Sequence, residues 1–338
     1  MLTIFRYLFI LVLLAAAGCS SDSPETQVPD QEQETDGTQD GGTDSGEDDN
    51  DGQTPSVAER ISGLTDLVDR ISTEETYTLT DNVSATELHY TTPDGSPIAM
   101  FVFEAKLTGG VTVTQTTPYD EGPGNGLQRV TEQALEVDAE NAMILGGTNA
   151  DFFMSQSYQP QGVFHHKGHA VKTTFASSPS RPRSFFYITR TGLARTAPAS
   201  EYAEISASNQ IYEACGGGPV LVSGGEAIQT PDPDDLSTEP RTCVGATEDG
   251  KTVYLMVIDG RQETYSVGMD FSDMAKVMEA LGCWSAINLD GGGSSTFYIR
   301  TDTSDASFSD EDRFEILNSP SDGQERAVWN GLAIIQRR

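Results

Sequence analysis

From residue 56 onward, apolar residues recur at helical spacing in only three stretches of the chain. These stretches cover residues 57–71, 126–140 and 271–281. A spacing of three or four residues between apolar positions predicts a helix with one buried face in each of them. The other apolar segments are shorter and are separated by turn residues, so we expect few helices and many strands.

The shorter apolar segments are rich in Val, Thr, Tyr and Phe, the residues that favour strands. Pro93-Asp94-Gly95 lies between two of them and is typical of a hairpin turn. Because strands outnumber helices and tight turns join most neighbours, the pattern predicts an α+β fold with mixed, largely antiparallel sheets and a few packed helices. The predicted strands are residues 76–80, 86–92, 98–107, 111–116, 142–146, 162–166, 169–173, 185–189, 202–206, 219–222, 244–246, 252–258, 286–289, 296–300 and 327–335.

The charge of the chain limits its partners. Its 338 residues include 52 Asp and Glu but only 20 Lys and Arg, a formal net charge of −32. Such a surface repels phosphate backbones and anionic membranes, so we expect no nucleic-acid partner and no electrostatic adsorption to a membrane. Twelve of the acidic residues lie between Ser20 and Pro55, which leaves a charge of −21 on residues 56–338.

The first 19 residues have the features of an export signal. Arg6 is the only charge, residues 7–14 are apolar, and small residues lead to Gly18-Cys19. The apolar run is too short to span a bilayer comfortably, and its ending resembles a bacterial lipoprotein box, which implies lipidation of Cys19. Because Ser20 follows the cysteine, we expect a protein of the bacterial cell envelope, anchored by its lipid alone and in the outer membrane.

The remaining chain divides into a linker and a single domain. Residues 20–55 are rich in Asp, Gly, Thr and Gln and lack aromatic residues, so they are predicted to be a disordered acidic linker. Residues 56–338 are predicted to form one domain. Residues 56–125 carry no motif that we can assign, and we interpret them as a variable N-terminal part of this domain.

The segment from Asn288 to Thr296 is the most informative in the chain. A predicted buried strand ends at Asp290, and Gly291, Gly292 and Gly293 follow before the hydroxyl residues. Backbone N–H groups in such a loop can approach an anion closely, although glycines also serve in purely structural turns.

Other polar groups also stand at the ends of predicted strands. Groups repeated at strand ends favour a shared site at one edge of a sheet, because strands give rigidity and their ends give access. The segments concerned are Gly147-Thr148-Asn149-Ala150-Asp151, Glu239-Pro240-Arg241-Thr242, Asp259-Gly260-Arg261 and Glu325-Arg326.

These segments, taken in order, resemble the phosphodiester glycosidase family. The resemblance covers roughly residues 126–336, and Asp290-Gly291-Gly292-Gly293-Ser294-Ser295 is its most specific part. The matching positions are Gly147, Asn149, Phe152, Gly217-Gly218-Pro219, Pro240-Arg241-Thr242, Gly245, Asp259-Gly260-Arg261, Asn288 to Ser295 and Glu325-Arg326.

The resemblance implies hydrolysis of a sugar-1-phosphate diester, with release of the free sugar and a phosphomonoester. A phosphate monoester leaves readily, so arginines that hold it can replace a strong general acid. A carboxylate must then act at the anomeric carbon. The expected catalytic residues are Asp290 first, then Asp259, Asp151 and Glu325. The expected substrate-binding residues are Asn149, Arg241, Arg261, Gly291, Gly292, Gly293, Ser294, Ser295 and Arg326.

Several alternatives remain open from the sequence. The polar residues at the strand ends could be structural: Asp259 with Arg261 a surface pair, Asp151 a turn residue, and Glu325 with Arg326 a structural pair. The chain could also be a non-catalytic carbohydrate-binding lipoprotein. A third alternative is a serine hydrolase that uses Ser294.

We expect no resident cofactor, although a divalent cation at the acidic strand ends stays possible. His165, His166 and His169 lie around a predicted hairpin tip, so they do not easily converge on zinc. Residues 302–312 hold five carboxylates and favour a solvated loop. Cys215, Cys243 and Cys283 allow one disulfide and one free thiol, or buried thiols.

Overall fold

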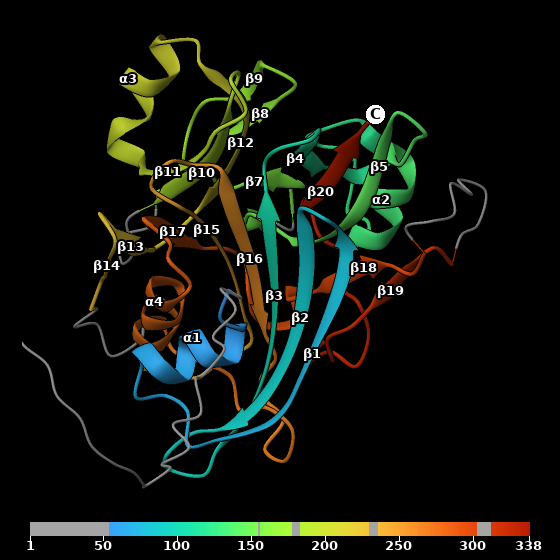
Figure 1. Ribbon diagram of the computed structural model, residues 1–338. Coiled ribbons are helices and arrows are strands. Elements are labelled where there is room, and N and C mark those ends of the chain that lie inside the picture. The colour runs from blue at the N-terminus through green and yellow to red at the C-terminus, as the bar shows by residue number, and fades with distance from the viewer. Residues whose placement is uncertain (1–53, 155, 178–182, 230–235, 303–311) are drawn as a thin grey trace, which may run out of the picture. The chain divides into compact units, whose positions relative to one another are not determined.

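A computed structural model describes residues 54–154, 156–177, 183–229, 236–302 and 312–338 (Figure 1). Residues 54–338 form one compact unit. Cys19 and the predicted linker up to residue 53 lie outside the described residues, as does most of the acidic segment 302–312. Among the described residues, no helix is long and apolar enough to cross a membrane.

The helices are few, as the sequence predicts. They are α1 (Val57–Leu64), α2 (Val130–Val137), α3 (Tyr202–Ala207) and α4 (Phe271–Ala280). Ser56 caps α1 through a capping box with Glu59, and the Asp270 carboxylate caps α4 by accepting the N–H of Asp273 at 2.8 Å.

Three antiparallel sheets form most of the domain. The largest has the order β1 (Arg70–Thr80), β2 (Val83–Thr91), β3 (Pro97–Lys106), β16 (Thr252–Ile258), β15 (Arg241–Ala246), β17 (Ser285–Asn288), β13 (Val220–Ser223) and β14 (Glu226–Ala227). The second has the order β11 (Ala194–Pro198), β10 (Ser184–Thr189), β12 (Ile211–Gly217), β8 (Phe164–His166) and β9 (His169–Lys172). The third has the order β19 (Phe314–Ile316), β18 (Phe297–Arg300), β5 (Ala142–Asn149), β20 (Gly331–Arg337) and β4 (Val111–Thr116). A short ribbon of β6 (Phe153–Met154) and β7 (Gln159–Pro160) follows β5.

The sheets and helices pack in layers. One face of the largest sheet packs against both smaller sheets, with Phe101, Phe103, Phe186 and Phe297 in the shared core. Its other face is covered by α1 and α4, which lie together in Figure 1. The outer face of the third sheet packs on α2, and that of the second sheet on α3. The central strands of each sheet are therefore buried on both faces, whereas the edge strands β1 and β9 are mostly exposed.

The predicted fold class is confirmed, and several strands end where the sequence predicts, as at Val111–Thr116 and Thr252–Ile258. Two predictions are wrong. The first helix ends at Leu64, and Ile71 lies in β1. The predicted strand at residues 202–206 is α3, because Tyr202 and Ile205 lie one helical turn apart and both face the same core.

The predicted variable region, residues 56–125, is built into the sheets. Its strands β1, β2 and β3 extend the largest sheet beyond β16, and β4 pairs with β20 in the third sheet.

Residues 289–296 carry the chain from β17 in the largest sheet to β18 in the third sheet. The glycine segment is thus a crossover between two sheets.

Candidate active site

One amide holds both ends of the crossover. Asn149, at the end of β5, donates from Nδ2 to the carbonyl oxygen of Asp290 at 2.6 Å. Its Oδ1 accepts the N–H of Thr296 at 3.2 Å and the hydroxyl of Thr242 at 2.9 Å. Asn149 is only 1% exposed. Because its three partners come from β15 and from the two ends of the crossover, this side chain fixes the loop relative to both sheets.

Most N–H groups of the glycine loop already have partners within the protein. That of Gly292 donates to Pro240 at 2.8 Å, that of Ser294 to Gly291 at 3.2 Å, and that of Ser295 to Gly292 at 3.2 Å. A loop whose N–H groups are already hydrogen-bonded within the protein is less suited to bind an anion than the sequence suggests. The positions of two neighbouring arginines indicate another role for the glycines, which is to leave space beside the backbone.

Two guanidinium groups lie directly over Gly292 and Gly293. A Cβ atom added to Gly292 would lie 3.3 Å from Nη2 of Arg261, and one added to Gly293 would overlap the guanidinium of Arg326. Nη1 of Arg326 also donates to the hydroxyl of Ser294 at 3.4 Å. The two side chains are 51% and 42% exposed, so they can meet a ligand. Glycine at both positions leaves room for two cations to approach the same short stretch of backbone.

Acidic partners orient both arginines. Nε of Arg261 donates to Glu239 at 2.6 Å, and Nε of Arg326 donates to Asp322 at 2.8 Å. Each guanidinium keeps further N–H groups on its other edge, because a planar guanidinium has five donors. These pairs hold the cations in place without exhausting their capacity to bind an oxyanion.

Asp290 stands at the start of this loop, partly buried. Burial raises its pKa to about 6, because the charged form is poorly solvated there. A hydrogen bond from the Ser294 hydroxyl opposes the rise, the negative charge of Asp151 adds to it, and the positive charge of Arg326 opposes it. A carboxyl group with this pKa can change protonation state near neutral pH, as acid–base catalysis requires.

Asp151 lies near Asp290, and both of its carboxylate oxygens already have partners within the protein. Its Oδ1 contacts Nη2 of Arg183 at 2.6 Å, and its Oδ2 accepts the N–H of Gly162 at 2.6 Å. Burial raises the pKa of Asp151, and the charge of Arg183 opposes that rise. The contacts suit Asp151 to tuning the charge near Asp290 rather than to touching a substrate.

Asp259 is linked to the glycine loop through the side chain of Asn318. It is 1% exposed, and it accepts from Nδ2 of Asn318 at 2.8 Å and from the N–H of Ser319 at 2.6 Å. Asn318 in turn donates to the carbonyl of Ser295 at 3.2 Å. Burial raises the pKa of Asp259 to about 6. Its oxygens face protein donors, so we interpret Asp259 as a positioning residue.

Glu325 and Arg241 point away from the loop. Glu325 accepts the N–H and the hydroxyl of Thr131, at 3.0 and 2.6 Å, in the first turn of α2. Arg241 donates to the carbonyls of Met269 and Ser237, and its guanidinium carbon lies 4.0 Å from the ring centroid of Phe271. Adjacent strand residues face opposite sides of a sheet, so Thr242 reaches Asn149 while Arg241 faces α4.

Several side chains that build the site were not predicted from the sequence. Glu239 and Thr242 lie within a strand-end segment but were not expected to act, whereas Arg183 lies in no motif and follows no predicted strand. The side chains concerned are Arg183, Glu239, Thr242, Asn318 and Asp322.

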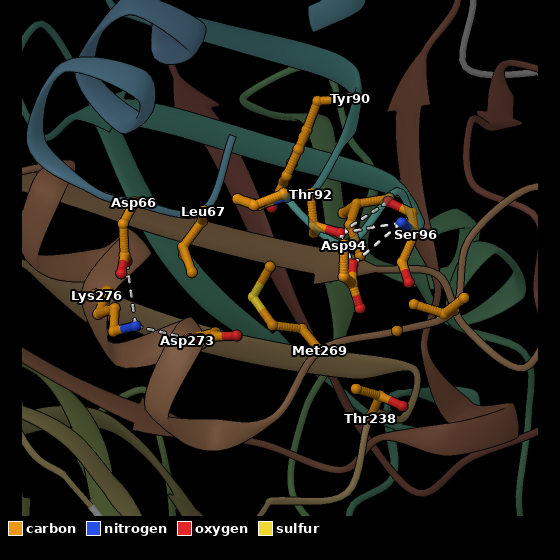
Figure 2. Close-up of a pocket in the computed structure, with 14 residues that line it drawn as sticks. Asp66, Leu67, Tyr90, Thr92, Asp94, Ser96, Thr238, Met269, Asp273 and Lys276 are labelled. Carbon is orange, nitrogen blue, oxygen red and sulfur yellow. Dashed lines mark hydrogen bonds and ion pairs between the residues drawn. The ribbon is translucent and has the colours of Figure 1, made fainter. Parts of the chain in front are cut away.

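Several cavities lie away from the crossover loop. A cavity of about 350 Å³ is bordered by Tyr90, Met269 and Asp273, on the face of the largest sheet that carries α4 (Figure 2). None of the predicted site residues lines it. In the described part of the chain, no group of three or more His, Cys, Asp or Glu residues is arranged to hold a metal ion. Cys215, Cys243 and Cys283 are buried free thiols.

The fold and the order of the strand-end motifs define a class of antiparallel α+β domains with a glycine crossover between two sheets. A family model described as phosphodiester glycosidase matches residues 142–335, which is more than half of the chain. The chain therefore belongs to the phosphodiester glycosidase family, and the resemblance seen in the sequence is confirmed.

Solved structures share the fold. The catalytic domain of zebrafish N-acetylglucosamine-1-phosphodiester alpha-N-acetylglucosaminidase, auto-inhibited by its pro-peptide, has a TM-score of 0.59 at 20% identity, over 78% of this chain and 88% of that one. A hypothetical protein from Synechocystis has a TM-score of 0.55 at 11% identity, over 80% of this chain and 64% of that one. A putative exported protein from Burkholderia pseudomallei K96243 has a TM-score of 0.52 at 14% identity, over 80% of this chain and 98% of that one.

One curated relative matches in sequence. The SPbeta prophage-derived uncharacterized protein YomE of Bacillus subtilis (strain 168) is 36% identical over 101 residues. The match covers 30% of this chain and 13% of YomE, so the two share only a short region.

The three hydrogen bonds of the Asn149 amide, which we call the Asn149 clamp, should contribute to the stability of the fold. Asn149→Ala leaves the buried partners of its amide without hydrogen bonds, and we expect the free energy of unfolding to fall by about 3 kcal/mol. Asn125→Ala, at an exposed amide, should change it by less than about 0.5 kcal/mol. Urea unfolding of both variants measures the difference. Equal stabilities would show that the clamp does not hold the crossover.

Proposed function

We propose that this protein hydrolyses a sugar-1-phosphate diester and releases a free sugar and a phosphomonoester. One observation carries the proposal: Arg261 and Arg326 converge over Gly292 and Gly293, next to Asp290. Membership of the phosphodiester glycosidase family supports the same reaction class. The name of the zebrafish protein makes α-linked N-acetylglucosamine the first sugar to test.

In this proposal the two arginines bind the phosphate of the diester. Guanidinium groups form paired hydrogen bonds with phosphate oxygens, and they balance the charge that grows on the phosphate as it leaves. The substrate phosphate would meet the N–H edges that face away from Glu239 and Asp322. The hydroxyl of Ser294 accepts from Arg326 and donates to Asp290, so it links the phosphate-binding arginine to the carboxylate.

Asp290 acts at the anomeric carbon in its ionised form. The bond between that carbon and the phosphate oxygen breaks, water supplies the new hydroxyl of the sugar, and the bonding electrons leave with the phosphomonoester. The carboxylate either stabilises the cationic carbon, attacks it, or takes the proton of the water. Asp151 and Asp259 support this group and its loop, and Glu325 supports α2.

The activity test uses a chromogenic or isotopically labelled ester of α-N-acetylglucosamine 1-phosphate. We expect the wild-type protein to release both N-acetylglucosamine and the phosphomonoester. Asp290→Asn should lower kcat by a factor of about 100 or more, because general acid–base and nucleophilic groups contribute on that order. Glu325→Gln is the matched control, since its carboxyl group faces Thr131, and it should retain most of the activity.

Other outcomes would favour the alternatives. If wild type and Asp290→Asn are equally inert on several sugar-1-phosphate diesters while a sugar still binds, the protein is a carbohydrate-binding member of the family. Esterase activity that Ser294→Ala abolishes would instead indicate a serine hydrolase.

The pKa of Asp290 predicts a pH dependence. The ionised group is present above a pH of about 6, so kcat/KM should fall as the pH drops through that value. Arg326 lowers this pKa, so Arg326→Met should move the midpoint to higher pH in addition to raising KM. Arg190→Met, on the turn between β10 and β11, should leave the midpoint in place. A midpoint that does not move in Arg326→Met would contradict the assignment of this limb to Asp290.

A further inference from the structure

A second cavity lies where the second and third sheets meet. It has a volume of about 310 Å³, within the range of sites for small molecules. Thr114 and Ile335 border it from the third sheet, Val137 and Asn141 from the end of α2 and the turn after it, and the turn between β8 and β9 closes it. None of the predicted site residues lines this cavity, which we call the seam cavity.

The ionisable side chains that line the seam cavity are all bases. In the described lining they are His166, Lys167 and Arg337, while Glu213 contacts His166 and Asp120 lies near Lys167. The three bases come from β8, from the turn that follows it, and from the end of β20. Two cations and an imidazole around one small cavity favour a ligand with anionic oxygens.

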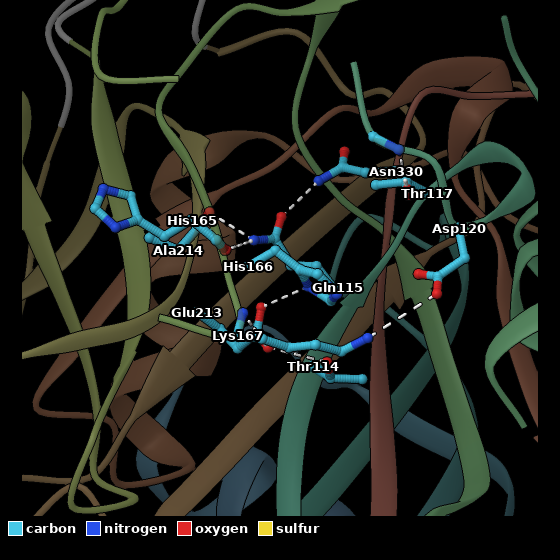
Figure 3. Close-up of polar contacts among 11 residues, drawn as sticks. Thr114, Gln115, Thr117, Asp120, His165, His166, Lys167, Glu213, Ala214 and Asn330 are labelled. Carbon is cyan, nitrogen blue, oxygen red and sulfur yellow. Dashed lines mark hydrogen bonds and ion pairs between the residues drawn. The ribbon is translucent and has the colours of Figure 1, made fainter. Parts of the chain in front are cut away.

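A buried carboxylate orients the imidazole. Glu213 is 2% exposed, and its Oε2 lies 3.1 Å from Nδ1 of His166 (Figure 3). Its Oε1 accepts the N–H of Lys167 at 3.2 Å and the hydroxyl of Thr114 at 3.2 Å. Since a carboxylate only accepts, Nδ1 of His166 carries the proton. Nε2 is then fixed in direction, and it is buried without a hydrogen-bond partner in the protein.

Lys167 and Gly168 form the two-residue turn between β8 and β9. Their φ angles of 50° and 80° are both positive, as this type of hairpin turn requires. The Lys167 side chain is 55% exposed, and Nζ lies 3.9 Å from the Oδ2 of Asp120, its acidic neighbour. The ammonium group can therefore turn from Asp120 toward a ligand. Arg337 stacks over Tyr212 with its guanidinium carbon 5.7 Å from the ring centroid.

We propose that the seam cavity binds a small organic phosphate monoester. Lys167 and Arg337 would contact the phosphate oxygens, and Nε2 of His166 would accept a hydrogen bond from a P–OH or a sugar hydroxyl. Val137 and Ile335 offer an apolar wall to the carbon skeleton. The proposal concerns a different place from the crossover loop, and it stands whether or not the crossover loop hydrolyses a diester.

Calorimetry with glucose 6-phosphate tests the proposal. The background is Arg261→Met with Arg326→Met, so that the crossover loop no longer competes for phosphate. We expect one molecule to bind to this double variant. Adding Lys167→Asn or Arg337→Met should weaken binding at least tenfold; asparagine is chosen because it tolerates the left-handed backbone of Lys167.

Two controls make the result decisive. Lys251→Asn removes a lysine from an exposed turn and should leave the affinity unchanged, and glucose without phosphate should bind at least tenfold more weakly. Unfolding curves confirm that each variant is folded. The proposal is overturned if the double variant binds no glucose 6-phosphate, if Lys167→Asn and Arg337→Met bind it as tightly as their background, or if glucose binds equally well.

Discussion

The geometry of the candidate active site depends on one buried amide. Asn149 lies at the end of β5 in the third sheet and holds Thr242 of the largest sheet, together with both ends of the crossover that joins the two sheets. Without such a clamp, a stretch of three glycines would sample many conformations, because glycine loses more backbone entropy on ordering than any other residue. The clamp therefore sets the position of Asp290 as well as the path of the backbone beneath Arg261 and Arg326.

The site places two arginines, each balanced by a carboxylate, within a strongly acidic protein. Arg261 and Arg326 are each held by a carboxylate, so the loop region is close to neutral without ligand and its guanidinium groups are already oriented. This arrangement favours a small oxyanion that can reach the free edges of both guanidinium groups, and it gives no long-range attraction for a polyanion. Glycine at positions 292 and 293 leaves room for the arginines beside the loop, while most N–H groups of the loop bond within the protein.

Much of the fold could be predicted from local pattern. Strand segments with turn residues on both sides, such as Thr252–Ile258, were located correctly, whereas α3 was missed because six residues carry too short a period to distinguish helix from strand. For the site, strand-end motifs correctly brought Asn149, Asp290, Arg261 and Arg326 together. They could not show that Arg241 and Glu325 face other elements, because the direction of a side chain depends on strand register. Arg183 reaches Asp151 through the tertiary fold alone, so no local pattern marks it.

The convergence of phosphate and sugar at the crossover loop can be tested by a crystal structure of the protein soaked with N-acetylglucosamine and phosphate together. We expect phosphate in contact with the guanidinium groups of both Arg261 and Arg326, and the anomeric carbon of the sugar beside the carboxylate of Asp290. Phosphate held instead by Arg183, or a sugar with its anomeric carbon far from Asp290, would contradict this convergence.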